Sequence, residues 1–323
     1  MKICVYGAGA IGGLMAAWLA RSGHDVAVIA RGAQLEAIRR DGLRVRSNGK
    51  TESFRVKAES EPARIGAQDY VLVTVKAQSL ADVATTIAPL LGPDTSVVTA
   101  MNGVPWWFFH GMKKHDAHLE SLDPGGKLAR AIPTERIVGC VIHLAASTPE
   151  PGLVSHNMGA RLILGEPGGG NTSRTRRIAD ALAAAGFEIV VTNTIEKEFW
   201  VKLLGNVSFN PVSALTVSTA DRLIESQEVK SYMVEIMREV LAIGRAVGVD
   251  ASIDPEARID MARSLGPFKT SMLQDLEAGK RLEIDGLLAG TLEIARKAGV
   301  RAPFTESLFG LIRARAQSTG QYR

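Results

Sequence analysis

The sequence predicts a two-domain protein in which an α/β domain with a doubly wound sheet is followed by an all-α domain. Short apolar runs typical of buried parallel strands recur between residues 3 and 191, separated by glycine turns and helical stretches. From residue 195 on, strand patterns nearly vanish and apolar residues recur at spacings of three and four. The 323 residues also exceed the size at which one core usually keeps growing. We therefore expect domains at 1–193 and 194–323.

Composition excludes several classes of protein. The chain is 46% hydrophobic and 22% charged, with interrupted apolar stretches that predict no membrane span. Its first residues, MKICVYGAG, lack the cleavage pattern of a signal peptide. Cys4 and Cys140 are too few for a disulfide framework, so we expect a reduced, cytoplasmic setting. The net charge of +4 is spread along the chain; it does not by itself indicate nucleic-acid binding, and it suits a modestly anionic small ligand equally well.

The N-terminus reads as strand, glycine turn, helix and second strand. Residues 7–12, GAGAIG, match G-x-G-x-x-G. Gly7 permits the sharp turn, Gly9 lets the backbone approach a pyrophosphate, and Gly12 lets helix and strand pack closely. Ala10 and Ile11 open the helix, whose free N–H groups face the anion. Because the motif sits between a strand and a helix, it predicts a Rossmann-type dinucleotide site; the alternative is a structural glycine turn.

The residue after the second strand discriminates between cofactors. NAD sites place Asp or Glu there, to accept a hydrogen bond from the ribose 2′-hydroxyl. This sequence has Arg31 at that point and no carboxylate until Glu36. A guanidinium suits a 2′-phosphate through paired, charge-assisted hydrogen bonds. We therefore expect NADP (NADPH) as the cofactor, the alternative being a solvated surface arginine.

Two further strands end in polar residues. The apolar run YVLVTV is followed by Lys76, and SVVTAM is followed by Asn102. Ligands of doubly wound sheets bind beyond the carboxyl ends of the strands, so both side chains are candidates for the cofactor crevice. Each could equally be an ordinary loop residue or helix cap.

The remaining elements complete the expected fold. Asn48-Gly49 predicts a hairpin turn. We expect further strands at 136–147, 152–157, 160–167 and 187–194, with a helix at 171–185. In the second domain we expect helices at 198–210, 226–249, 255–265 and 283–300.

The first helix of the second domain carries an unusual stripe. In EFWVKLLGNVSFN, Lys202, Asn206 and Asn210 recur every four residues and so share one narrow face, with apolar residues on both sides. A buried ammonium is costly, so this face is expected to wall an active site that meets the nicotinamide across the domain boundary. The alternative is a structural lysine, snorkelling or paired with Glu198 or Glu283.

Five segments together resemble the ketopantoate reductase (2-dehydropantoate 2-reductase) family: GAGAIG, VKA, NGV, WVKLLGNVSFNPVSALT and KTSMLQDLEAGKRLEIDGL. The resemblance covers nearly the whole chain in order. It implies reduction of ketopantoate by NADPH to pantoate, in pantothenate biosynthesis. It further implies Lys202 as proton donor, Glu283 as holder of a substrate hydroxyl, Asn206, Asn210 and Ser271 as substrate-site residues, Asn102 between substrate and nicotinamide, and Gly7, Gly9, Gly12, Arg31 and Lys76 as cofactor positions.

One segment departs from that family's pattern. Residues 105–136 form an insert that opens with Trp106, Trp107, Phe108 and Phe109. These rings would either shape a larger, more apolar pocket or pack the insert onto its domain. The insert also holds His110, His115 and His118, which offer no clear tetrahedral ligand set, so no metal is expected.

Other functions stay open at this point. A family relative acting on a different 2-keto acid would present much the same residues. A 3-hydroxy acid dehydrogenase of the 6-phosphogluconate or hydroxyacyl type shares the two-domain plan, and a non-catalytic NADPH sensor would keep the fold without the chemistry. The helical domain and the commonness of twofold assemblies suggest a homodimer.

Overall fold

The computed structural model covers residues 1–323 and describes all of them except 111, 113–117, 265 and 323. The chain forms two compact units. The first comprises Met1–Met101, Phe109–Met112 and Gly125–Ile195, and the second comprises Asn102–Phe108, Lys113–Pro124 and Glu196–Arg323. Parts of the aromatic insert therefore belong to the second unit, although they precede the last strands of the first in sequence.

The first unit is built on one mixed sheet. Among the described residues its strand order is β4-β3-β9-β8-β7-β6-β1-β2-β5, with β10 paired to β9. Strand β1 is central, parallel to both β2 and β6, and its apolar residues are fully buried. The strands are β1 (Lys2–Tyr6), β2 (Asp25–Ile29), β3 (Leu43–Ser47), β4 (Lys50–Phe54), β5 (Lys57–Glu59), β6 (Gln68–Val73), β7 (Leu91–Ala100), β8 (Ile137–Glu150), β9 (Leu153–Gly165) and β10 (Glu188–Val191).

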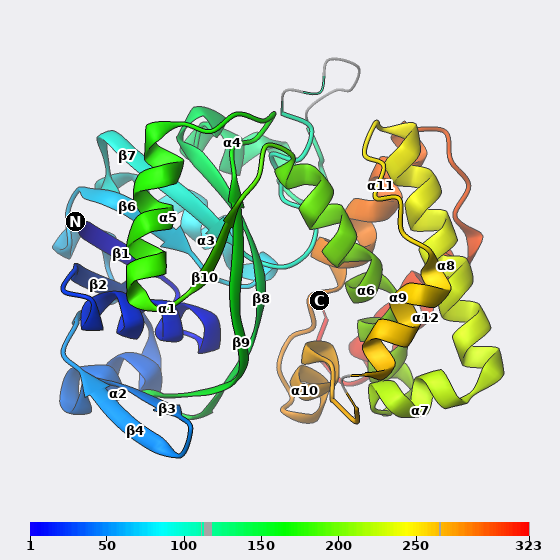
Figure 1. The fold of residues 1–323 in the computed structure, drawn as a ribbon, viewed down its shortest axis with the longest axis horizontal. Helices are drawn as coiled ribbons and strands as arrows, with labels where there is room; N and C mark the ends of the chain where they lie inside the picture. Colours follow the sequence, from blue (N-terminus) through cyan, green and yellow to red (C-terminus); the bar gives the residue numbers. More distant parts are fainter. Residues whose placement is uncertain (111, 113–117, 265, 323) are drawn as a thin grey trace. The chain divides into compact units, whose positions relative to one another are not determined.

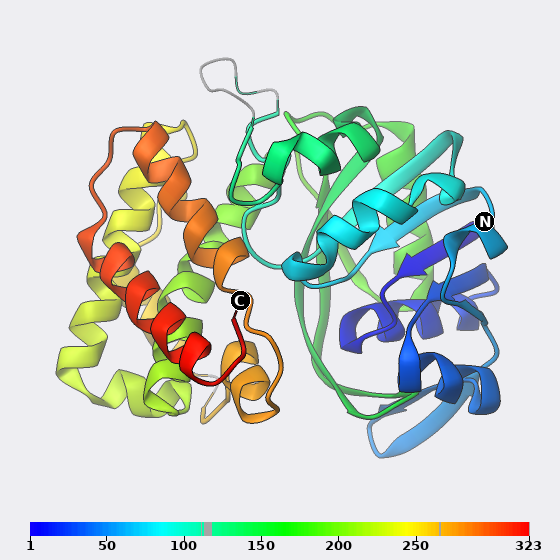
Figure 2. The same ribbon diagram turned by 180° about the vertical axis from the view of Figure 1, so that it is seen from behind.

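Helices cover both faces of this sheet. Helices α1 (Ala10–Arg21) and α5 (Ser173–Ala185) pack against each other on one face (Figure 1). Helices α3 (Leu80–Thr86) and α4 (Lys127–Ala131) lie together on the opposite face (Figure 2). Helix α2 (Gly32–Asp41) packs against β3 and β5. The expected Rossmann-type arrangement is thus confirmed.

The core of the first unit explains the apolar pattern of its elements. Leu14, Met15 and Leu19 of α1 are fully buried, as are Ile178 and Leu182 of α5. Burying each such side chain contributes roughly 1.5–3 kcal/mol. In α5 the spacing of four residues between Ile178 and Leu182 gives the helix one apolar face, whereas α1 is buried continuously over residues 12–19.

The expectation of two separate strands between residues 152 and 167 was wrong. Two strands were expected over 152–157 and 160–167, but β9 runs through both as one long strand, antiparallel to β8. The pairing shifts register around Ala145, and Gly159 adopts a positive φ of 70°. The strand therefore bends without ending. The hairpin at Asn48-Gly49 is confirmed, since β3 and β4 pair antiparallel on either side of it.

The described residues of the second unit after Glu196 form helices joined by loops, with no strand. Its helices are α6 (Ile195–Thr216, whose first residue belongs to the first unit), α7 (Ala220–Glu225), α8 (Gln227–Ala246), α9 (Pro255–Arg263), α10 (Ser271–Glu277), α11 (Gly290–Lys297) and α12 (Pro303–Ser318). Side-chain caps mark three starts: Ser226, Asp254 and Thr270 each accept a backbone N–H at α8, α9 and α10.

The segment expected to be one helix over 283–300 is more complex. Before α11 the chain forms a π turn at Asp285–Ala289. Such turns widen a helix by one residue and are frequent at functional sites. No helix in the described part of the chain is long and apolar enough to cross a membrane. Both cysteines are buried and form no disulfide with each other, and burial raises the pKa of Cys4 to about 12.

Candidate active site

The glycine loop of the first unit has the shape that a dinucleotide needs. Gly7 has φ 110°, in the region that favours glycine. A Cβ on Gly12 would stand 2.0 Å from the carbonyl oxygen of Gly7, so helix and turn pack too closely for any side chain. Beside Gly9, by contrast, no atom lies within 4 Å of where a Cβ would be. That open backbone precedes α1, whose N-terminus has no side-chain cap, so the residues present fit a bound pyrophosphate.

Arg31 lies after β2, as the sequence predicted, but it has a partner that sequence reasoning missed. Its Nη1 donates to Oδ2 of Asp82 on α3 at 2.9 Å, and both side chains are more than half exposed. The hydrogen bond from Arg31 to Asp82 raises the pKa of the guanidinium. Lys76 follows β6 and precedes a 3₁₀ turn at Ala77–Ser79. The carboxylate of Asp82 therefore fixes the direction of the Arg31 guanidinium.

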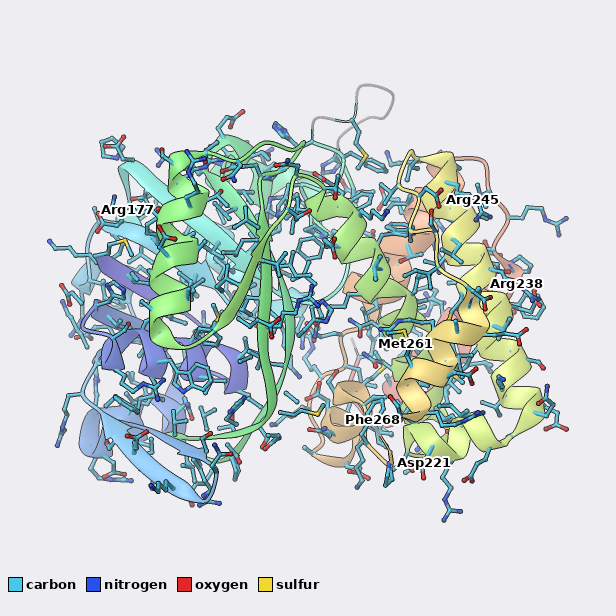
Figure 3. The ribbon with its side chains drawn as sticks, in the orientation of Figure 1. Arg177, Asp221, Arg238, Arg245, Met261 and Phe268 are labelled. Atoms are coloured by element: carbon cyan, nitrogen blue, oxygen red, sulfur yellow. The ribbon has the colours of Figure 1, made fainter. Side chains whose placement is uncertain are left out.

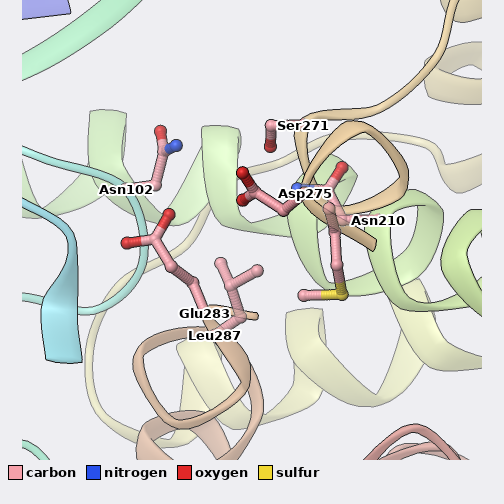
Figure 4. A pocket seen from close by; sticks show the side chains of 7 residues that line it. Asn102, Asn210, Ser271, Asp275, Glu283 and Leu287 are labelled. Carbon is pink, nitrogen blue, oxygen red and sulfur yellow. The ribbon is translucent and has the colours of Figure 1, made fainter. Parts of the chain in front are cut away.

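The second unit contains a small pocket. It is lined by Asn102, Asn210, Ser271, Met272, Asp275, Glu283 and Leu287. Asn102 and Glu283 lie on one side, and Asn210, Ser271 and Asp275 on the other (Figure 4). Four substrate-site candidates from distant parts of the sequence are thus brought together.

Lys202 reaches this group through a direct bond. Its Nζ donates to Oδ1 of Asn102 at 2.8 Å. Lys202 is partly exposed, whereas Asn210, two turns further along α6, is only 8% exposed. The stripe therefore becomes progressively buried along the helix. Asn206 lies between them, partly exposed, and is not among the residues that line the pocket.

The loop that carries Asn102 is held against the π turn. The N–H of Val104 donates to the carbonyl oxygen of Gly286 at 2.9 Å. A Cβ on Gly103 would stand 2.3 Å from that same oxygen, and Gly103 has φ 84°. Only glycine allows this approach. The contact ties the position of Asn102 to the segment that bears Glu283.

Gln321, near the C-terminus, makes hydrogen bonds to the segment that carries the pocket residues Asp275 and Glu283. The buried amide of Gln321 donates to the carbonyl oxygens of Asp275, at 3.1 Å, and of Lys280, at 2.7 Å. Its backbone oxygen accepts the N–H of Leu282 at 3.1 Å. These bonds brace the turn between α10 and Glu283.

Asp275 was missed as a site residue. It follows Ser271 by four residues on α10, so both side chains share one helix face and both line the pocket. The spacing in SMLQD was therefore a usable signal. Met272 and Leu287 supply the apolar part of the lining and carry no comparable sequence signal.

The aromatic insert packs against the unit that holds the pocket. Trp106, Trp107, Phe108 and Phe109 are all at most 4% exposed. Trp107 makes an edge-on contact with Phe199 at 5.4 Å between centroids, and the ring of Phe108 lies 5.2 Å from that of Trp200. Phe199 and Trp200 belong to α6. The packing interpretation is supported.

The described histidines of the insert, His110 and His118, belong to no group of metal ligands. His118 Nε2 pairs with Glu120 at 2.7 Å, and His115 lies outside the described residues. In the described part of the chain no three His, Cys, Asp or Glu side chains are grouped as metal ligands.

An α/β unit with a glycine loop suited to a dinucleotide, followed by a helical unit in which Lys202 bonds to Asn102 of a pocket that also holds Glu283, is the arrangement of a nicotinamide-dependent oxidoreductase. Residues 3–169 match the family model described as "Ketopantoate reductase PanE/ApbA", and residues 194–316 match its C-terminal counterpart. The chain belongs to this family of NAD(P)-dependent 2-keto acid reductases. The resemblance noted from the sequence is confirmed, and a plain 3-hydroxy acid dehydrogenase is set aside.

Individual relatives agree with the family assignment. A 2-dehydropantoate 2-reductase of Mesorhizobium japonicum is 42% identical over the full length of both chains. A crystal structure from Ralstonia solanacearum MolK2, named provisionally as a ketopantoate reductase, has 45% identity, a TM-score of 0.95 and 99% coverage of both chains. D-mandelate dehydrogenase, solved with NADH and anilino(oxo)acetate, shares the fold at 21% identity and a TM-score of 0.86, with 99% of each chain covered.

Proposed function

We propose that this protein reduces 2-dehydropantoate (ketopantoate) to pantoate with NADPH, as a step of pantothenate biosynthesis in the cytoplasm, and that it works as a homodimer. The observation that carries the proposal is the bond from Lys202 Nζ to Asn102 Oδ1 beside a pocket containing Glu283. The names of the relatives, led by the 42% identical 2-dehydropantoate 2-reductase, support the substrate.

The proposed chemistry assigns Lys202 to the keto oxygen. The nicotinamide, when bound, supplies the hydride. As the carbonyl carbon accepts it, negative charge develops on oxygen, where the ammonium of Lys202 stabilises the charge and donates a proton. The amide oxygen of Asn102, 2.8 Å from Nζ, orients the ammonium before the reaction. A preorganised donor of this kind costs no reorganisation in the transition state.

The pocket residues would select the rest of the substrate. The carboxylate of Glu283 can accept a hydrogen bond from a substrate hydroxyl, and Ser271 and Asn210 can orient polar groups without adding charge. Met272 and Leu287 present apolar surface suited to a branched carbon chain. Ketopantoate has both a hydroxyl and a branched carbon and so matches this lining.

For the cofactor, Gly7, Gly9, Gly12, Ala10 and Ile11 would hold the pyrophosphate at the start of α1, and Lys76 would contribute a cation. Arg31 would bind the 2′-phosphate, which makes NADPH the proposed cofactor. The preference for NADPH over NADH is reduced by Asp82, because its carboxylate already pairs with Arg31 and would compete with the 2′-phosphate.

A second candidate substrate class is an aryl 2-keto acid. Its support is the fold shared with D-mandelate dehydrogenase, together with the apolar Met272 and Leu287 in the pocket. Glu283 favours ketopantoate over this class, because an aryl keto acid leaves the carboxylate without a hydroxyl partner.

The deciding experiment is NADPH oxidation with a panel of 2-keto acids, each repeated with NADH. The panel contains ketopantoate, its analogue without the hydroxyl, and phenylglyoxylate. We expect the highest kcat/KM for ketopantoate with NADPH. A higher value for phenylglyoxylate would favour the second candidate, and turnover of none would reject both.

A further inference from the structure

Arg258, on α9, is an arginine whose burial has no explanation in the fold. It is half-buried, and its Nε is buried without a hydrogen-bond partner. Within the described residues its guanidinium forms no ion pair. Burial alone lowers the pKa of this guanidinium, with no carboxylate to offset the cost. Buried arginines are usually paired, so an orphaned one requires a reason.

The position of Arg258 supplies that reason. A Cβ placed on Gly205 of α6 would stand 3.2 Å from Nη2, 3.8 Å from Cζ and 4.0 Å from Nε of Arg258. The guanidinium therefore lies directly over the backbone of Gly205, where the missing side chain makes room for it.

Gly205 belongs to the open face of α6. Lys202, Gly205 and Asn206 are all partly exposed, whereas Leu203, Leu204 and Val207 are buried. Residues three apart on a helix are neighbours, with side-chain origins about 5–6 Å apart. The guanidinium of Arg258 therefore meets α6 three residues along the helix from Lys202, at Gly205, which borders the polar stripe.

The charge balance of the pocket calls for such a group. Its lining includes two carboxylates, Asp275 and Glu283, and no arginine. Every 2-keto acid brings a further carboxylate, and a guanidinium within reach of it would favour its binding. Lys202 is the group proposed for the keto oxygen, and the carboxylate is on the adjacent carbon. Lys202 of α6, and Arg258 of α9 where it meets α6 at Gly205, would each offer a cation to one of the two neighbouring oxygen groups of the substrate.

We propose that Arg258 binds the carboxylate of the 2-keto acid substrate through paired hydrogen bonds, and that Gly205 is present to seat it. This rests on the proposed function in that the substrate is a 2-keto acid. It adds a residue that selects acids over neutral ketones, because the planar guanidinium matches a carboxylate in two places at once. Met261, three residues later on α9, is 63% exposed and is labelled on that helix in Figure 3.

The test compares a 2-keto acid with its neutral primary amide. The variants are Arg258→Met and Arg258→Lys, with Arg263→Met as the matched control. Arg263 is on the same helix but is 58% exposed and pairs with Asp260. In Arg258→Met we expect kcat/KM for the acid to fall roughly 10- to 150-fold. The amide should be reduced equally well by the variant and the unmodified protein, and the NADPH dissociation constant should not change.

Arg258→Lys should recover only part of the loss, since an ammonium cannot bind both carboxylate oxygens in one plane. Gly205→Ala provides a second variant that does not depend on removing the arginine. Alanine favours the helix, yet its Cβ would displace Nη2, so the melting temperature should hold while KM for the acid rises. Equal losses for acid and amide in Arg258→Met would show that Arg258 is structural and overturn the proposal.

Failure of the proposed function would be recognised separately. If the unmodified protein reduces no 2-keto acid, binding of oxalate is measured by titration calorimetry, without turnover. Oxalate should then bind at least tenfold more weakly to Arg258→Met than to Arg263→Met. Absent or unchanged oxalate binding would overturn the assignment of Arg258.

Discussion

Lys202 and Asn102 are separated by a hundred positions in sequence, and Nζ of the lysine donates to Oδ1 of the asparagine at 2.8 Å. This bond joins the helix that carries the polar stripe to the loop that follows β7. It also gives the ammonium a fixed direction before any substrate arrives. The first prediction tests the role of that ammonium.

Lys202→Ala should fold normally and still bind NADPH, because the glycine loop and Arg31 belong to the other unit. Its kcat should fall about 10²–10⁴-fold, the usual effect of losing a general acid. Lys202→Arg should restore little, since arginine keeps its proton. Steady-state kinetics with the best substrate of the panel measures this. Near-normal turnover in Lys202→Ala would make the stripe structural and the mechanism wrong.

Glu283→Ala should affect substrates unequally. If the carboxylate holds a substrate hydroxyl, the loss of kcat/KM should be much larger for ketopantoate than for the analogue without the hydroxyl. A site built for a hydroxyl already discriminates against a substrate that leaves its polar group unpaired. The ratio of the two values, before and after the mutation, is the measurement. A uniform loss would instead assign Glu283 to positioning.

The Arg31–Asp82 pair predicts opposite effects on cofactor affinity. Arg31→Ala should weaken NADPH binding by roughly 1.5–3 kcal/mol and leave NADH nearly unchanged, since only NADPH carries the 2′-phosphate. Asp82→Asn should strengthen NADPH binding because it removes both the competing acceptor and a negative charge. Fluorescence titration of both nucleotides measures these constants. Equal affinity of the unmodified protein for NADPH and NADH would contradict the assignment of Arg31.

We expect the aromatic insert to stabilise the fold and not to determine which substrate is preferred. Trp107→Ala removes a buried ring that contacts Phe199 and should destabilise the protein by roughly 3–5 kcal/mol. The ranking of keto acids should stay the same. Calorimetric unfolding and the substrate panel are measured on the same preparation. A changed ranking with an unchanged melting temperature would show that the insert shapes the pocket.

Glu166 predicts a pH-dependent contribution to stability. It is 4% exposed; its burial raises the pKa, but hydrogen bonds from Arg174, Thr172 and Thr175 outweigh this and lower it below the ordinary 4.5. A carboxyl with a lowered pKa stabilises the fold above its unfolded pKa, and that stability is lost as pH falls through the folded pKa. At pH 7, Glu166→Gln should cost roughly 1.5–3 kcal/mol.

The cost of Glu166→Gln should shrink as the pH is lowered from about 5 toward 3. Glu188→Gln is the matched control, because the side chain of Glu188 is 70% exposed. Melting temperatures measured across this range give the comparison. If Glu166→Gln lowers the stability by the same amount at every pH, the charge of Glu166 does not contribute, and the side chain stabilises the fold through packing alone.

Much of the architecture could be predicted from local pattern. The run of residues 3–6, the glycines of 7–12 and the Asn48-Gly49 turn each specify their conformation through backbone freedom and apolar periodicity. Two elements differ from what their local pattern predicted. The long strand β9 passes through Gly159 because pairing with β8 outweighs the local break signal, and the π turn at Asp285–Ala289 interrupts a regular helical pattern.

The sequence by itself determined the fold class and the residue types of the site, because periodicity and short motifs depend on neighbours within a few positions. Only the tertiary structure decided which distant groups meet. It joined Lys202 to Asn102, gave Arg31 the partner Asp82, and seated Arg258 over Gly205. A side-chain bond of about 3 Å depends on how whole elements pack, since hydrogen bonds weaken steeply with distance and angle. Local sequence carries no record of that packing.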